Sequence, residues 1–176
     1  MVAHISAANP RYAEHVETAG RLASASEAIV KELAHARERD EQAFTLVVEA
    51  QRLPNETAEQ KTSRASAIEA ALVHAAEEPL KAAALALDVL HLSKQLLQIP
   101  NKSLVSDIGC AAEFAFASLE ACGYNVRINH RFMRDETAIA KQSKLLQRYE
   151  QEGVQVLGDV RHAVREALRK TDRAHH

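Results

Sequence analysis

The chain has 176 residues and a formal net charge of −2 at pH 7, so it has no general electrostatic drive toward nucleic acid or an anionic membrane. No apolar run approaches the ~20 residues that span a bilayer, and the first residues lack the pattern of a signal peptide. Aromatic residues make up 4% and Trp is absent, so a core must be built from Ala, Leu, Val and Ile. We expect one domain, residues 1–176, with long helices and short connections.

The first long helix is predicted to begin at Asn9, a good N-cap, with Pro10 at its first position, and to end before Pro54. A break near Arg39 is an open alternative. At 100° per residue its apolar side chains fall on one stripe. They are Val16, Ala19, Leu22, Ile29, Val30, Leu33, Phe44 and Val47.

Three more helical segments follow in the chain. Thr57 is predicted to cap the second helix, which Pro79 either kinks or divides. The segment 103–129 reads as one helix capped by its own first serine, and the last helix is predicted to begin near Asp135. A frayed tail is expected from about 170 to 176. Helical periodicity dominates and no strand pattern appears, so we expect an all-α, antiparallel bundle of long helices.

Cysteine and histidine give little indication of a metal site. Cys110 and Cys122 would lie ~18 Å apart on a shared helix at 1.5 Å per residue, too far for a disulfide, which favours a reduced, cytoplasmic protein. Carboxylate–histidine pairs at helical spacing resemble di-iron ligand pairs, but His35 lies opposite the apolar stripe. We therefore expect no metal site. The three pairs are Glu32/His35, Asp88/His91 and Asp159/His162.

Two carboxylates stand out because one lies on an apolar helix face and the other lies at the start of an apolar helix. Asp40 falls on the first apolar stripe, where a carboxylate is costly unless it is paired. Arg37 is placed to pair with it, whereas a helix break would leave Asp40 exposed as a cap. Asp107 heads the third helix, where the helix dipole alone would favour it.

Asn125 and Asn129 lie near the end of that helix. Asn125 is five turns beyond Asp107 and points the same way, ~27 Å further along at 1.5 Å per residue. The two ends cannot serve one small site within one chain, so either they have separate roles or a partner chain brings them together. Arg127 and the arginines after it form a cationic ridge that either receives a carboxylated ligand or complements the helix dipole.

Residues Asp40 to Glu136 resemble the cyclodeaminase/cyclohydrolase family in order and spacing. The similar stretches are "DEQAF", "AQRLPNET", "EEPLKAAALALDVL" and "SDIGCAAEFAFASLEACGYNVRIN". Members of that family usually begin with a Gly-rich segment, whereas this chain begins with "MVAHIS". The most specific matches are Leu53-Pro54-x-x-Thr57, Ser106-Asp107-x-Gly109 and Asn125-Val126-x-x-Asn129.

The resemblance implies an all-helical homodimer that acts on a tetrahydrofolate derivative without a tightly bound cofactor, membrane or nucleic acid. The implied reaction is hydrolysis of 5,10-methenyltetrahydrofolate to 10-formyltetrahydrofolate, or cyclisation of 5-formiminotetrahydrofolate with release of ammonia. A non-catalytic relative that serves as a dimerisation or interaction module is the alternative. The implied catalytic residues are Asp107 and Asp40, and the implied folate-binding residues are Ser106, Asn125, Asn129, Arg64 and Arg127.

Overall fold

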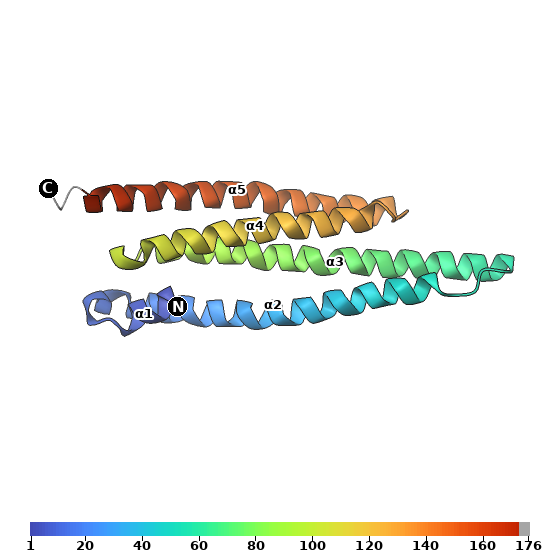
Figure 1. Cartoon of the computed structure of the whole chain (residues 1–176), viewed down its shortest axis with the longest axis horizontal. Coiled ribbons are helices and arrows are strands. Elements are labelled where there is room, and N and C mark those ends of the chain that lie inside the picture. Colours follow the sequence, from blue (N-terminus) through green and yellow to red (C-terminus); the bar gives the residue numbers. More distant parts are fainter. Residues whose placement is uncertain (173–176) are drawn as a thin grey trace.

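The computed structural model describes residues 1–172, and within that range it is all-α with no strand, as predicted. Consecutive long helices run antiparallel, and α1 lies at the same end of the elongated bundle as the last turns of α5 (Figure 1). The expected frayed tail is helical up to Asp172, and 173–176 lie outside the described residues. None of the helices in the described range is both long and apolar enough to cross a membrane. The helices are α1 (Val2–Ala8), α2 (Val16–Gln51), α3 (Ala58–Leu96), α4 (Val105–His130) and α5 (Glu136–Asp172).

The start of α2 differs from the prediction. The Asn9 Oδ1 accepts a hydrogen bond from the Arg11 backbone N–H at 3.0 Å, as expected of a cap. That cap begins a short 3₁₀ helix, Pro10–His15, in which Tyr12 leaves helical geometry, and α2 begins only after it. From there α2 is continuous, so the alternative of a break near Arg39 is wrong.

The start of α3 was predicted correctly. The Thr57 hydroxyl accepts a hydrogen bond from the Gln60 backbone N–H, and the Gln60 side chain accepts one from the Thr57 N–H, both at 3.1 Å. This reciprocal pair satisfies two backbone donors that a helix start leaves without partners. Pro79 lies inside α3 and does not divide it.

The predicted cap of α4 was wrong, whereas the predicted start of α5 near Asp135 was correct. Ser103 was expected to cap α4, but it lies in a 3₁₀ turn, Lys102–Leu104, and no side chain caps α4. The turn places Leu104 at the helix boundary, so the serine is one residue too early to act as the cap. Asp135 does cap α5, because its Oδ1 accepts a hydrogen bond from the Ala138 N–H at 2.9 Å.

The central helix of the bundle is α3, which packs against α2, α4 and α5. The helices α4 and α5 also pack against each other, whereas α2 packs mainly on α3 and α1. Ala, Leu and Val dominate the buried positions, as the composition implied. Helix α2 buries side chains near its two ends, but none over 24–35. One end belongs to a cluster with α1 and Ile99, and the other to a cluster with α3 and Met133.

Candidate functional site

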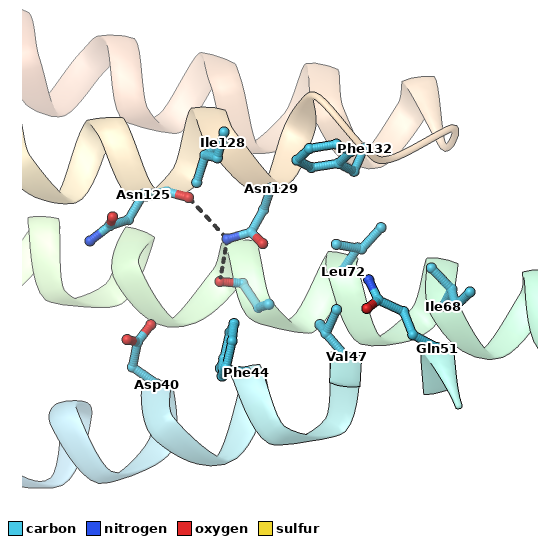
Figure 2. Close-up of a pocket in the computed structure, with 11 residues that line it drawn as sticks. Asp40, Phe44, Val47, Gln51, Ile68, Leu72, Asn125, Ile128, Asn129 and Phe132 are labelled. Carbon is cyan, nitrogen blue, oxygen red and sulfur yellow. Dashed lines mark hydrogen bonds between the residues drawn. The ribbon is translucent and has the colours of Figure 1, made fainter. Parts of the chain in front are cut away.

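A pocket of about 550 Å³ lies between α2, α3 and α4, and we call it the Asp40 pocket. Its size is within the range of about 300–1,000 Å³ that is usual for small-molecule sites. Figure 2 shows α2 and α4 as its two sides, with α3 between them. Most of the lining is apolar, with a few polar groups. The lining residues are Asp40, Phe44, Val47 and Gln51 of α2, Ile68, Leu72 and Ala75 of α3, and Asn125, Ile128, Asn129 and Phe132 of α4 and the turn after it.

The pocket brings together three of the seven predicted site residues. Asp40, Asn125 and Asn129 all line it, although Asp40 is separated from the asparagines by most of the sequence. Each was singled out because a polar group occupied an otherwise apolar helix face. The packing of α2 and α4 on the same helix, α3, brings those two faces to one site.

Asp40 is the titratable group of the pocket. Partial burial raises the pKa of Asp40, and the nearby carboxylates of Glu78 and Glu41 raise it further. Arg37 does not pair with it, as had been considered, but faces Glu41 at 4.0 Å. A carboxyl with a raised pKa, open to the pocket, is suited to accept and return a proton during a reaction.

The two asparagines differ in what they can offer a ligand. The Asn129 side-chain N–H₂ donates to the backbone carbonyls of Ala75 at 3.1 Å and of Asn125 at 2.9 Å (Figure 2). These bonds attach the end of α4 to α3 and fix the Asn129 rotamer. The side-chain amide of Asn125 has no hydrogen-bond partner within residues 1–172, so it can bind a ligand edge with both donor and acceptor.

Aromatic rings enclose the pocket although they remain exposed. Phe44 is 68% exposed and Phe132 is 63% exposed, and they lie on α2 and on the turn after α4, respectively. Exposed phenylalanine rings that line a pocket are available to stack on a flat ligand, which would remove them from water. The pocket thus offers ring faces, an amide and a titratable carboxyl.

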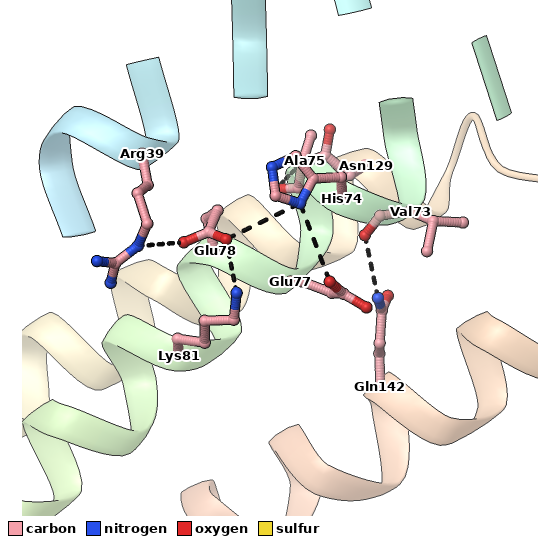
Figure 3. A network of polar contacts seen from close by, with 9 residues as sticks. All are labelled: Arg39, Val73, His74, Ala75, Glu77, Glu78, Lys81, Asn129 and Gln142. Atoms are coloured by element: carbon pink, nitrogen blue, oxygen red, sulfur yellow. Dashed lines mark hydrogen bonds and ion pairs between the residues drawn. The ribbon is translucent and has the colours of Figure 1, made fainter. Parts of the chain in front are cut away.

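A buried carboxylate that the sequence analysis missed lies beside this pocket. Glu78 of α3 is 1% exposed, and it accepts hydrogen bonds from Arg39 Nε at 2.9 Å and from Lys81 Nζ at 2.7 Å (Figure 3). The ring nitrogen Nδ1 of His74 lies 3.9 Å from Oε1 of Glu78. Burial raises the pKa of Glu78, but the bonds from Lys81 and Arg39 outweigh it and bring the pKa below its usual value.

Glu78 therefore stays ionised next to Asp40. Its negative charge helps to raise the pKa of Asp40, so two neighbouring carboxyls have pKa values that are pushed apart. Such a divergence is typical of acid–base sites. A signal for Glu78 was present in the sequence, because it shares one helix face with Ala71, Ala75 and Ala82 at heptad-like spacing, where a carboxylate is unexpected.

Asp107 and Ser106 lie at the opposite end of α4. Asp107 is partly exposed in the first turn of α4, with no hydrogen bond or ion pair to another described residue. Ser106 is exposed and lines a separate cavity of about 370 Å³ between α4 and α5. Since α4 is continuous, the structure keeps Asp107 away from the Asp40 pocket of its own chain.

The two predicted arginines are engaged elsewhere. Arg64 donates through Nε and Nη2 to the Gln51 carbonyl at 3.1 and 2.8 Å, which satisfies the C-terminal end of α2. It borders a smaller cavity that shares Ile68 and Phe132 with the Asp40 pocket, so it lies next to the site. Arg127 instead donates to Glu150 of α5 at 2.7 Å and does not line the pocket.

Metal-ligating residues do not gather anywhere in the described part of the chain. Over residues 1–172 there is no group of three or more His, Cys, Asp or Glu that could hold an ion. His91 pairs with Glu152 at 2.9 Å, and His35 lies 3.6 Å from Glu38. The lining of the Asp40 pocket offers a carboxyl, amides and aromatic rings.

Similarity to known proteins extends over most of the chain. A sequence model of the formiminotransferase-cyclodeaminase family matches residues 1–148. The chain is 28% identical over 147 residues to methenyltetrahydrofolate cyclohydrolase of Methylorubrum extorquens, across 84% of this chain and 71% of that protein. It is 30% identical over 155 residues to formimidoyltransferase-cyclodeaminase of Mus musculus, across 85% of this chain but 29% of the mouse protein.

The fold is also shared with a solved structure. The crystal structure of formiminotetrahydrofolate cyclodeaminase from Thermotoga maritima matches 96% of this chain and 80% of that chain, with a TM-score of 0.83 and 23% identity. At this level of identity, the match shows that the two chains have the same helical architecture.

Proposed function

Because the chain belongs to the formiminotransferase-cyclodeaminase family, we propose that the Asp40 pocket binds a tetrahydrofolate derivative and acts on its one-carbon group. The reaction is either hydrolysis of 5,10-methenyltetrahydrofolate to 10-formyltetrahydrofolate or cyclisation of 5-formiminotetrahydrofolate with release of ammonia. The observation that carries this proposal is Asp40, a carboxyl with a raised pKa that lines a largely apolar pocket.

Both reactions pass through a tetrahedral carbon between two nitrogens, and both need a proton to be moved. In the hydrolysis, water forms a bond to the methenyl carbon and gives a proton to the Asp40 carboxylate. Asp40 then returns the proton to N5 as the carbon–N5 bond breaks, and the hydroxyl on the carbon loses its proton to solvent, which leaves the formyl group on N10. In the cyclisation of the protonated formimino group, N10 forms the bond to the formimino carbon and gives its proton to Asp40. Asp40 returns that proton to the amino nitrogen as the bond between this nitrogen and the carbon breaks, so that ammonia leaves.

The other residues of the pocket bind and orient the substrate. The amide of Asn125 can pair with the donor and acceptor edge of the pterin, and Phe44 and Phe132 can stack on its faces. Asn129 holds the end of α4 in place through Ala75, and Arg64 at the adjacent cavity is the nearest guanidinium among the predicted residues for a substrate carboxylate. We propose no tightly bound cofactor, because proton transfer and positioning are sufficient for either reaction.

The direct test is turnover by the purified protein. We expect faster loss of methenyltetrahydrofolate absorbance than the spontaneous rate, or ammonia release from the formimino substrate, and loss of that acceleration in Asp40→Asn. Glu38→Gln is the matched control, because Glu38 is an exposed carboxylate two residues away on α2 and does not line the pocket. A folded protein that accelerates neither reaction would refute the proposal and favour a non-catalytic relative.

A further inference from the structure

Helix α3 contains a proline at a position where a helix needs a backbone donor. Pro79 is buried inside α3, which continues on both sides of it. Because proline has no backbone N–H, residue 79 cannot make the helical hydrogen bond to the carbonyl of Ala75, four residues earlier. Ala75 is 7% exposed and lines the Asp40 pocket. A buried carbonyl without a partner costs free energy, so this one needs a donor from elsewhere.

Asn129 of α4 supplies that donor. Its Nδ2 lies 3.1 Å from the carbonyl oxygen of Ala75 and 2.9 Å from the carbonyl oxygen of Asn125 (Figure 2). The bond to Ala75 joins residues that are 54 positions apart in the sequence. A side chain from another helix thus replaces the hydrogen bond that Pro79 removes from α3.

The two bonds fix which way the Asn129 amide faces. A side-chain NH₂ group has two hydrogens, and here each carbonyl takes one of them. The reversed amide would place Oδ1 against two carbonyl oxygens with no hydrogen between them, so the hydrogen-bond network excludes it. Oδ1 therefore lies on the side away from the two carbonyls, and within residues 1–172 it accepts no hydrogen bond (Figure 2).

Asn125, in the same pocket, lacks this constraint. Its side-chain amide has no hydrogen-bond partner in the described part of the chain, so it can turn either its oxygen or its nitrogen toward a ligand. Asn129 cannot turn without breaking two bonds. A fixed acceptor discriminates between ligands, because it binds a donor and leaves a ligand acceptor at the same point unsatisfied.

We propose that Pro79 positions Asn129 as a fixed hydrogen-bond acceptor, so that the Asp40 pocket selects ligands that present an N–H donor to Oδ1. This inference rests on the proposed function, in which the donor belongs to the tetrahydropterin ring. That ring carries N–H donors and acceptors side by side along its edge, so a fixed acceptor admits fewer orientations of the ring than a freely turning amide would. Pro79 is a positioning residue, because it acts through Asn129.

Thermal unfolding tests the exchange of partners without a ligand. Asn129→Ala leaves the Ala75 carbonyl without a donor and should lower the midpoint temperature. In Pro79→Ala, the N–H of residue 79 serves that carbonyl, so Asn129→Ala should lower the midpoint temperature by much less. Gly158→Ala is the matched control, because a Cβ there meets nothing within 4 Å and adds helix propensity to α5 alone. Equal costs of Asn129→Ala in all three backgrounds would overturn the proposal.

Side-chain amide exchange in NMR spectra measures the positioning directly. The Asn129 NH₂ protons, identified by their loss in Asn129→Ala, should exchange about fivefold faster in Pro79→Ala, the effect of losing one hydrogen bond. Gln142 is an internal control, because its Nε2 donates at 3.2 Å to the carbonyl of Val73, whose helical donor is present in both chains. Unchanged Asn129 exchange would overturn the proposal whether or not the protein binds folate.

Binding of a stable reduced folate, 5-formyltetrahydrofolate, tests the effect on the pocket. Pro79→Ala should weaken binding by about fivefold and yet raise the midpoint temperature, because alanine restores a helical hydrogen bond. In an Asn129→Ala background, Pro79→Ala should not weaken binding further, whereas in Asn125→Ala, which keeps the backbone carbonyl, it should weaken binding as before. Equal losses in both backgrounds would mean that Pro79 does not act through Asn129.

Methylated rings test whether Oδ1 binds a donor. Three tetrahydropterins are compared, methylated at N3, at N8 or twice on the 2-amino group. One of them should lose about fivefold more affinity in the unmodified chain than in Asn129→Ala, because its methyl group replaces the hydrogen that Oδ1 accepts. The same losses in both chains for all three rings would overturn the proposed selection.

Two further outcomes separate this proposal from its neighbours. Glu78 directly precedes Pro79, so a shifted pH profile of kcat in Pro79→Ala would mean that the proline acts through Glu78 and Asp40, which would overturn the proposal. If the unmodified chain binds no reduced folate but Asn129 exchange is faster in Pro79→Ala, the proposed function fails and the positioning of Asn129 by Pro79 is supported.

Discussion

Replacement of Glu78 by glutamine should destabilise the fold by about 2 kcal/mol at pH 7. Each hydrogen bond between charged groups contributes about 1.5–3 kcal/mol, and Glu78 accepts two, from Arg39 and Lys81. The full loss is not expected, because Arg39 and Lys81 are 37% and 53% exposed and can be solvated, and glutamine still accepts one bond. For a chain of this size, the midpoint temperature should fall by about 4–8 °C.

The pH dependence of this loss follows from the direction of the pKa shift. The pKa of Glu78 is lower in the folded protein than its usual value of 4.5, so its pairs contribute fully above that pH. The contribution is lost as the pH falls through the folded-state pKa. The difference between Glu78→Gln and the unmodified chain should therefore shrink below about pH 4.5.

Urea unfolding followed by circular dichroism at a fixed protein concentration is the appropriate assay, since the chain has no Trp for fluorescence. Glu77→Gln is the matched control, because Glu77 is adjacent on α3 but half exposed, with only His74 nearby at 4.0 Å. We expect that control to change the free energy of unfolding by less than about 0.5 kcal/mol. Equal stability of the two variants at pH 7 would refute the argument that the buried pairs of Glu78 stabilise the fold.

Three further outcomes are expected from the structure. Gly158→Ala should raise the free energy of unfolding by about 0.5–1 kcal/mol in urea titration, because a Cβ there has nothing within 4 Å, whereas Gly153→Ala should gain less, since its Cβ would lie 3.1 Å from Leu119. Thr57→Ala should cost about 1 kcal/mol in the same titration through loss of the helix cap. Asp40→Asn should abolish turnover and yet slightly raise thermal stability at pH 7, because neighbouring charges and burial disfavour its ionised form; the gain should fade as the pH falls through the raised pKa.

The sequence was most informative where the interactions are local. The Thr57 cap, the start of α5 near Asp135 and the long helical periods each depend on residues within a few positions of each other, so the pattern alone was sufficient. The error at Ser103 is of the same local kind, because a 3₁₀ turn and the first turn of an α-helix have similar sequences.

The site was predictable only in part, because its geometry depends on contacts between helices. Asp40 and Asn129 were recognised as polar groups on apolar faces, but their common pocket arises from how α2 and α4 pack on α3. Glu78 was missed because Arg39, one of the two side chains that hold it, comes from another helix, 39 residues away in the sequence. The sequence left two roles open for Arg127, which were ligand binding and complementing the helix dipole. The structure shows instead that Arg127 donates a hydrogen bond to Glu150 of α5.

Helix α2 packs on the rest of the bundle mainly near its two ends, because its middle has no fully buried side chain. Because no side chain of 24–35 is fully buried, local opening there exposes little additional apolar surface, and its amide protons should exchange faster than those of 43–50. The end of α2 that carries Asp40 is anchored separately from the end that packs on α1. We therefore expect any bending of α2 to be concentrated in 24–35, between the two anchored ends.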